Sequence, residues 1–223
     1  MHGTKLVIVV MLLWYSIAGA QVLDLKKAYG TTLLQLTETL LERQVKEEQA
    51  PTCGAIACKA CNVWHTRAGE SVYPFSVAYG ITGEARYLQA AKNAAAWLIR
   101  QQEVNGSWKE TPEEWTGTTT DQLLMLMLAY DIIHTHFTAT EEKAWQESIS
   151  KAAGYLYAVM KPEFASINYV ATTTATLAKA YAFTKINSIY KGRGNWRTER
   201  SRRWMNMGSS MGKAAGVLAI SWG

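Results

Sequence analysis

The sequence lacks several patterns that would identify a common class of protein. Its apolar stretch near the N-terminus, Leu6–Ile17, is shorter than the about 20 residues that a membrane-spanning helix needs, and no later segment does better. It has no glycine-rich phosphate loop, no Rossmann glycines and no Ser-His-Asp ordering. It also has no convincing strand alternation. These absences leave a helical protein without the signatures of a nucleotide-binding enzyme or a serine hydrolase.

The N-terminus has the layout of a secretory signal peptide over residues 1–20. Lys5 supplies a positive start, the apolar stretch follows, and Ala18-Gly19-Ala20 is a small-residue cleavage site. We therefore expect a soluble, exported chain, either periplasmic or secreted, with cleavage after Ala20.

Basic charge is concentrated at the C-terminal end. The formal net charge is +5, but the residues from Ile186 onward carry +6, because seven Lys or Arg residues there face Glu199 alone. Subtraction leaves −1 for residues 1–185. A body that binds nucleic acid would carry positive charge itself, so nucleic acid is not the expected partner.

The body of the chain reads as helices separated by short turns. Apolar residues recur at helical spacing, Pro74 fits a first turn, and Thr138 and Glu141 have the spacing of a capping box. The predicted helices span residues 23–48, 70–78, 84–102, 118–133, 138–160 and 168–184. This pattern implies an all-α antiparallel array, which spacing alone does not assign to a bundle, a solenoid or an α/α toroid.

The tail over residues 186–223 is rich in arginine, glycine and serine and has no helical period. One interpretation is a disordered basic tail. Another is a shifted reading frame, because the residues from Lys185 can be back-translated so that the adjacent frame is amphipathic and resembles Thr82–Lys92. In that case the chain is the N-terminal piece of a longer enzyme, and the nucleotide sequence decides between the two.

All the cysteines lie in one irregular segment, in the pattern Cys53-x4-Cys58-x2-Cys61, followed by His65. These side chains can supply ligands to a structural Zn²⁺. A disulfide between two of the cysteines, natural in an exported protein, is the competing interpretation and leaves one thiol over. The third interpretation is that these are plain buried or surface cysteines. A zinc site or a disulfide would make this segment a braced loop.

Two pairs of polar residues are candidates for chemistry. His65 and Arg67 precede a predicted helix, where histidine can move a proton near neutral pH and arginine can bind a carboxylate. Asn168 and Tyr169 open another helix after a loop, where an amide and a phenol can face one cleft. The structural alternatives are a loop hydrogen bond or metal bond for His65, a surface position for Arg67, and a helix cap and packing for Asn168 and Tyr169.

Aromatic residues in loops and at helix starts can line a sugar-binding groove, although most tryptophans are expected in the core. The candidates to stack on sugar rings are Trp64, Trp108 and Trp115, with Tyr73 and Tyr169 nearby in similar positions. They indicate a carbohydrate ligand.

Several of these motifs resemble the helical domain of exported bacterial polysaccharide-degrading proteins, nearest to the heparinase II/III-like polysaccharide lyases. The resemblance covers residues 24–185. The motifs are Cys58-x2-Cys61-x3-His65-x-Arg67, Val72-Tyr73-Pro74-Phe75, Thr82-Gly83-x3-Tyr87-Leu88, Gly106-Ser107-Trp108, Trp115-x-Gly117-Thr118-Thr119 and Ile167-Asn168-Tyr169. It implies an incomplete α/α toroid that binds an acidic polysaccharide and cleaves it by β-elimination.

The resemblance also implies roles for the candidate residues. Asn168 and Arg67 would neutralise the uronate carboxylate, Tyr169 or His65 would be the base or acid, and Tyr73 is a further candidate. No cofactor is implied for the chemistry itself. The chain departs from these lyases in lacking a β-sandwich, so we expect weak activity or none from it alone.

Two alternatives stand beside the lyase. A glycoside hydrolase on the same scaffold needs two carboxylates across the scissile bond, and the acidic residues in the body show no such pairing. A non-catalytic carbohydrate-binding or helical envelope protein would need neither.

Overall fold

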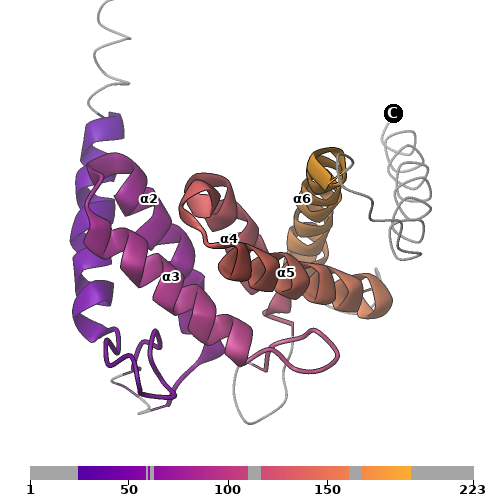
Figure 1. The fold of residues 1–223 in the computed structure, drawn as a ribbon, viewed down its shortest axis with the longest axis horizontal. Coiled ribbons are helices and arrows are strands. Elements are labelled where there is room, and N and C mark those ends of the chain that lie inside the picture. Colours follow the sequence, from indigo (N-terminus) through magenta and orange to yellow (C-terminus); the bar gives the residue numbers. More distant parts are fainter. Residues whose placement is uncertain (1–24, 59, 61–62, 110–116, 161–166, 192–223) are drawn as a thin grey trace, which may run out of the picture. The chain divides into compact units, whose positions relative to one another are not determined.

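The computed structural model describes residues 25–58, 60, 63–109, 117–160 and 167–191 (Figure 1). In this part of the chain nearly all regular structure is helical, and β-pairing is limited to an isolated bridge between Gln44 and Ile56. The all-α prediction is thus confirmed. Among the same residues, no helix is both long enough and apolar enough to cross a membrane.

The predicted signal peptide over residues 1–20 lies outside the described residues, and so does most of the basic tail. The last described helix continues to Lys191, several residues past the predicted end near Thr184. Export and the shifted reading frame therefore remain predictions.

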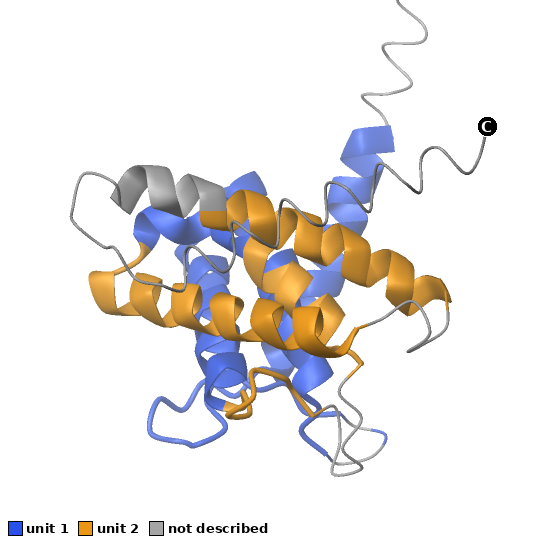
Figure 2. Cartoon of the chain, turned by 90° about the vertical axis from the view of Figure 1, so that its right-hand side faces the viewer, with its two compact units in different colours: residues 1–100, 129–136 blue, residues 101–128, 137–223 orange. Residues whose placement is uncertain are grey.

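The chain divides into two compact units (Figure 2). Unit 1 contains residues 1–100 and 129–136, and unit 2 contains residues 101–128 and 137–223. Helix α4 (Thr119–Ile133) supplies residues to both units.

Unit 1 begins with a helix over residues 25–43 and continues with the 3-10 helix η1 (Thr66–Ser71), α2 (Val72–Thr82) and α3 (Ala85–Arg100). Pro74 is the third residue of α2, as predicted, where its missing N–H costs no helical hydrogen bond. Gly83 ends α2 with a left-handed φ of 72°, and its N–H donates to the carbonyl of Tyr79 over 2.7 Å.

The core of unit 1 is built on the small-residue face of α3. Helix α2 packs against α3, and η1 does too. Small side chains let neighbouring backbone approach closely, which is why this face is rich in alanine. The buried residues on α3 are Tyr87, Ala90, Ala91, Ala94, Ala95, Trp97 and Leu98.

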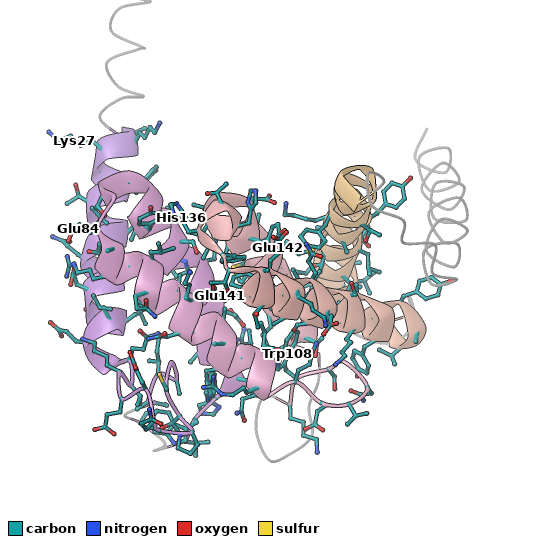
Figure 3. The ribbon with its side chains drawn as sticks, viewed as in Figure 1. Lys27, Glu84, Trp108, His136, Glu141 and Glu142 are labelled. Atoms are coloured by element: carbon teal, nitrogen blue, oxygen red, sulfur yellow. The ribbon has the colours of Figure 1, made fainter. Side chains whose placement is uncertain are left out.

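Unit 2 contains α5 (Ala139–Val159), which packs against α6 (Ile167–Lys191). The predicted capping box at the start of α5 is present. The hydroxyl of Thr138 accepts from the N–H of Glu141 over 3.2 Å, and the Glu141 carboxylate accepts from the N–H of Thr138 over 2.7 Å. Figure 3 labels Glu141 at this helix start. The short η2 (His134–His136), which belongs to unit 1, follows α4.

The predicted helix over residues 23–48 is shorter in the structure and ends at residue 43. The N–H of Val45 donates to the carbonyl of Ala55 over 2.9 Å instead of continuing the helical ladder. The side chain of Gln44 turns inward and donates to the carbonyls of Gly54 and Ala90. These hydrogen bonds therefore end the helix five residues before the predicted end at residue 48.

Candidate functional site

The 3-10 helix η1 presents Arg67 to solvent in unit 1. Its buried residues include Thr66 and Gly69. Gly69 lies so close to α3 that an added β-carbon would be 2.9 Å from Cδ1 of Leu98. Because one side of this short helix is pressed against α3, the Arg67 side chain projects outward, with an exposed fraction of 51%.

Arg67 forms an ion pair with Glu70. The Nε atom of Arg67 lies 3.6 Å from a carboxylate oxygen of Glu70, one 3-10 turn later. The Glu70 side chain is 27% exposed, and its paired oxygen is buried. The guanidinium itself is at the surface, where it can meet the carboxylate of a ligand.

The other candidates in unit 1 flank Arg67 along the chain. His65 is a half-buried, extended residue directly before η1, and its carbonyl accepts from the N–H of Ala68 over 2.9 Å. Trp64 exposes 41% of its surface. Tyr73 is the second residue of α2 and is half-buried. The segment thus places an exposed indole, an imidazole and a guanidinium in succession.

The cysteine segment is only partly described. Cys53 is a half-buried free thiol whose carbonyl accepts from the guanidinium of Arg100 over 2.8 Å. The N–H of Cys58 donates to the carbonyl of Val63 over 3.4 Å, whereas Cys61 lies outside the described residues. Among the described residues, no three His, Cys, Asp or Glu side chains gather in a way that could hold a metal ion. Because Cys61 was one of the proposed ligands, the zinc site and the disulfide both remain predictions.

Trp108, in unit 2, is fully buried (Figure 3). Its backbone N–H donates to the hydroxyl of Thr119 over 3.0 Å at the start of α4. A ring with no exposed surface cannot stack on a sugar, so this tryptophan packs in the interior and does not match the predicted sugar contact. Trp115 lies outside the described residues.

Asn168 and Tyr169 are the second and third residues of α6. Asn168 is exposed and Tyr169 is half-buried. The carbonyl of Asn168 accepts from the hydroxyl of Thr172 over 2.9 Å, as expected within a helix. The amide therefore lies in the first turn at the surface of unit 2, where it can meet a ligand.

A buried polar contact joins α6 to α4. The hydroxyls of Thr120 and Thr173 are 3.1 Å apart, and the hydroxyl of Thr176 donates to the carbonyl of Thr120 over 3.3 Å. Thr173 and Thr176 are the seventh and tenth residues of α6, so these bonds hold its second and third turns against α4. The sequence contains these threonines, but it does not indicate that the side chains on α6 bond to Thr120 on α4.

A charged cluster in unit 1 was not predicted. Arg86 contacts the carboxylates of Glu38 and Glu84, with N–O separations of 2.8 Å and 2.7 Å, and the hydroxyl of Tyr87 donates to Glu38. The hydrogen bond from Tyr87, together with Arg86, holds the pKa of Glu38 below its ordinary value. Burial, and then the Glu38 carboxylate, raises the pKa of Tyr87, which makes this phenol a poor base. The cluster ties the N-terminal helix to α3.

A second unpredicted contact joins Tyr79 to His136, also in unit 1. The tyrosine hydroxyl lies 3.0 Å from Nε2 of the histidine, and the rings meet edge to face at 5.1 Å. The ammonium of Lys92 donates to the carbonyl of His136 over 2.7 Å. Figure 3 labels His136. These bonds fasten the end of η2 to α2 and α3.

Comparison with known proteins adds family information. The chain is 26% identical over 190 residues to the broad-specificity ulvan lyase of Formosa agariphila (strain DSM 15362 / KCTC 12365 / LMG 23005 / KMM 3901 / M-2Alg 35-1). That alignment covers 82% of this chain and 28% of the relative, so the chain spans well under a third of that protein. No solved structure matches at a significant level. The profile of the ulvan lyase N-terminal domain matches residues 33–210, and the chain therefore belongs to the ulvan lyase N-terminal domain family.

Proposed function

We propose that this chain is the helical part of an exported polysaccharide lyase that cleaves a uronic-acid-containing polysaccharide by β-elimination. The observation that carries the proposal is the family match over residues 33–210. The relative named as an ulvan lyase makes ulvan the first substrate to test. Because the chain spans 28% of that relative, the activity is proposed for the longer protein, and weak activity or none for this chain alone.

The chemistry of β-elimination sets the roles that residues must fill. A base removes the proton on the carbon next to the uronate carboxylate, and the glycosidic oxygen then leaves as a double bond forms. A cation or amide must stabilise the negative charge that builds on the carboxylate. An acid must protonate the departing oxygen.

In unit 1 we assign the carboxylate-binding role to Arg67. Its guanidinium is exposed, lies 3.6 Å from a carboxylate oxygen of Glu70, and has the planar fork geometry that suits a ligand carboxylate. His65, two residues earlier, is a candidate base or acid, with Tyr73 as a further one. The exposed ring of Trp64 can stack on a neighbouring sugar.

In unit 2 we assign the amide role to Asn168 and the base or acid role to Tyr169. Both lie in the first turn of α6, and the amide is exposed. Positive helix-dipole charge at this end favours a nearby anion. Trp108 is not included because its ring is buried.

The finer features of the resemblance belong to the same proposal. They are an incomplete α/α toroid of the kind found in heparinase II/III-like lyases, export to the periplasm or beyond, and a structural zinc at Cys53, Cys58, Cys61 and His65. The zinc would brace the segment that carries Arg67 and would take no part in the reaction. Zinc content of the purified protein by mass spectrometry tests it directly.

Incubation of the purified chain, and of the full-length gene product, with ulvan tests the activity. A lyase gives a product with a new carbon–carbon double bond, seen as rising ultraviolet absorbance, in step with new reducing ends. A glycoside hydrolase gives reducing ends without the absorbance, and this outcome would overturn the proposed reaction. Absence of both products from the full-length protein would overturn it as well.

Variants distinguish the assigned residues from neighbours of the same type. We expect Arg67→Ala, Asn168→Ala and Tyr169→Phe to lower kcat/KM of the full-length enzyme by about 100-fold or more, since each removes a group that acts on the reacting sugar. Tyr157→Phe is the matched control, because Tyr157 is 41% exposed on α5 and has no assigned role. If Tyr157→Phe lowered kcat/KM as much as the three site variants, the losses would reflect a general effect on folding.

Carbohydrate binding without catalysis is the second candidate for the chain as it stands. It is favoured by the exposed Trp64 next to Arg67 and by the short span relative to the ulvan lyase. Affinity electrophoresis through ulvan would show retardation of the wild-type chain that Trp64→Ala removes, with no product formed.

A further inference from the structure

Two glutamine side chains, one in each unit, make the same set of hydrogen bonds. The amide of Gln44 donates to the carbonyls of Gly54 and Ala90, over 3.2 Å and 2.9 Å. The amide of Gln102 donates to the carbonyls of Gly106 and Ser148, both over 3.0 Å. Each glutamine thus joins a following glycine to a helix much later in the chain.

The backbone around each glutamine also repeats. The backbone N–H of the residue that follows the glutamine donates to the carbonyl of the residue that follows the glycine: Val45 to Ala55, and Glu103 to Ser107, both over 2.9 Å. The N–H of the glycine donates in the opposite direction, from Gly54 to the carbonyl of Val45 and from Gly106 to the carbonyl of Glu103, again both over 2.9 Å. We call each set of bonds a clamp, the first around Gln44 and Gly54 and the second around Gln102 and Gly106.

Both glycines have the same conformation and the same close contact. Their φ angles are 91° for Gly54 and 97° for Gly106. A β-carbon would lie 1.9 Å from the carbonyl oxygen of Asn93 in α3 at the first position, and 2.3 Å from that of Lys151 in α5 at the second. In both helices this carbonyl lies three residues after the one that accepts from the glutamine. The two clamps therefore dock on α3 and α5 in the same way.

The sequence spacing agrees with the geometry. Gln44 and Gln102 are 58 residues apart, and the same spacing relates six of the seven buried residues of α3 to the six buried residues of α5, with Trp97 as the exception. The matched pairs are Tyr87 and Trp145, Ala90 and Ser148, Ala91 and Ile149, Ala94 and Ala152, Ala95 and Ala153, and Leu98 and Leu156. Every member of these pairs is buried.

The N-terminal helix supplies an internal comparison. Tyr29 and Leu36 occupy the positions 58 residues before Tyr87 and Ala94. They are 70% and 64% exposed, whereas Tyr87 and Ala94 are 2% and 0% exposed. No clamp from the described residues docks on this first helix. Thr37, 58 residues before the buried Ala95, is itself only 1% exposed, so the difference in burial holds at Tyr29 and Leu36 and not along the whole helix face.

We infer that the chain contains a 58-residue helical repeat and that Gln44 and Gln102 are equivalent positioning residues within it. The first clamp precedes the segment with the candidate residues His65 and Arg67, and the second precedes the buried Trp108 and helix α4. The geometry of the clamps does not depend on which reaction the protein performs.

The two clamps close loops of different length, so the shared hydrogen bonds cannot be a product of one particular loop. Nine residues lie between Gln44 and Gly54, but three lie between Gln102 and Gly106. A short turn could impose its own hydrogen bonds, but two loops of such different length would not impose the same ones. The bonds from the glutamine to the next helix are what the two copies share.

Reactivity of the Cys53 thiol tests the first clamp, because Cys53 is half-buried and adjacent to Gly54. Wild type, Gln44→Met and Gln102→Met are reduced, freed of metal with a chelator and treated with a pyridyl disulfide in native buffer, and peptide mass spectrometry follows each cysteine. We expect Gln44→Met to raise the Cys53 rate about tenfold, since two carbonyls lose their donor, while Gln102→Met stays within about twofold of wild type. Equal rates in wild type and Gln44→Met, or an equal rise in both variants, would overturn the inference.

The variant Gln44→Glu adds a pH-dependent readout that a purely structural role would not give. An ionised glutamate has no proton to donate, whereas a protonated one can donate one hydrogen bond. The ratio of the Cys53 rates in Gln44→Glu and Gln44→Met should therefore fall as the pH drops and the carboxyl takes up its proton. A pH-independent ratio would contradict the donor role.

Hydrogen exchange of the wild-type protein tests both clamps without any substitution. The N–H groups of Val45, Gly54, Glu103 and Gly106 should all exchange slowly, because all four are bonded within a clamp. The fully exposed Val104 is the fast-exchanging reference within the second loop. Fast exchange at either pair of clamp amides would overturn the repeat.

Discussion

The α-carbon of Gly54 faces the backbone of Asn93 so closely that an added β-carbon would lie 1.9 Å from the Asn93 carbonyl oxygen. In this contact, the backbone of the cysteine segment at Gly54 lies directly against the backbone in the middle of α3. The same glycine has a φ of 91°, which a residue with a side chain rarely adopts. Two independent requirements, one steric and one conformational, therefore select glycine here.

Gly54→Ala should destabilise unit 1 strongly. We expect a loss of about 3 kcal/mol or more in the free energy of unfolding, from the clash and the strained φ together. Gly83→Ala is the matched control, because Gly83 also has a positive φ of 72° but nothing lies within 4 Å of its β-carbon position. The control should lose about 1–2 kcal/mol, from the backbone alone. Chemical denaturation of both variants measures the difference, and similar losses would show that the contact with Asn93 is unimportant.

Thr138→Ala should remove half of the capping box at the start of α5. The expected loss is about 1 kcal/mol, because the N–H of Glu141 loses its acceptor. Thr140→Ala, two residues later on the exposed surface of the same helix start, is the control and should change stability by less than about 0.5 kcal/mol. Thermal unfolding followed by circular dichroism is sufficient to separate them.

Glu38→Gln should change how stability depends on pH. The pKa of Glu38 is lowered in the folded protein, first by the hydrogen bond from Tyr87 and then by Arg86. Its contribution to stability is therefore present above the unfolded pKa and is lost as the pH falls through the folded pKa. The stability difference between wild type and variant should be constant near neutral pH and shrink below about pH 4. The side chain is 38% exposed, so the difference will be modest.

Glu42→Gln is the control for that experiment, since it lies on the same exposed helix one turn later. Urea titrations of wild type and both variants across the acid range give the measurement. A difference for Glu38→Gln that stays the same down to pH values below about 3 would rule out the pairing as its cause.

Thr119→Val should loosen the first turn of α4. Its hydroxyl accepts from the N–H of the buried Trp108 over 3.0 Å, and a methyl group in its place leaves that N–H without an acceptor. We expect a loss of about 1–3 kcal/mol and a change in tryptophan fluorescence. Thr174→Val, at an exposed position of α6, should leave both almost unchanged.

Most of the helices could be predicted from the sequence because their signals are local. The apolar period located α3, α4 and α5, Pro74 marked a first turn, and Thr138 with Glu141 marked a helix start. The predicted end of the first helix was wrong, because the bonds of Gln44 to Gly54 and Ala90 are tertiary. Local periodicity contains no information about such a bond.

The candidate site was less predictable for the same reason. The sequence identified Arg67 and Trp64 as residues of the right chemical type, and both are exposed. It assigned Trp108 to the surface, although the ring is buried beneath the start of α4. A tryptophan next to a glycine turn looks the same in sequence whether its ring points inward or outward.

The two clamps have an evolutionary consequence. The glutamine and glycine of a clamp lie within the repeated sequence. Duplication of one repeat therefore also duplicates the residues that attach it to the next helix. Arrays of this kind draw their stability from neighbouring units and can gain or lose a unit without a new fold being invented. The two loops, of nine and three residues, show that the length of chain between glutamine and glycine can differ while the attachment stays the same.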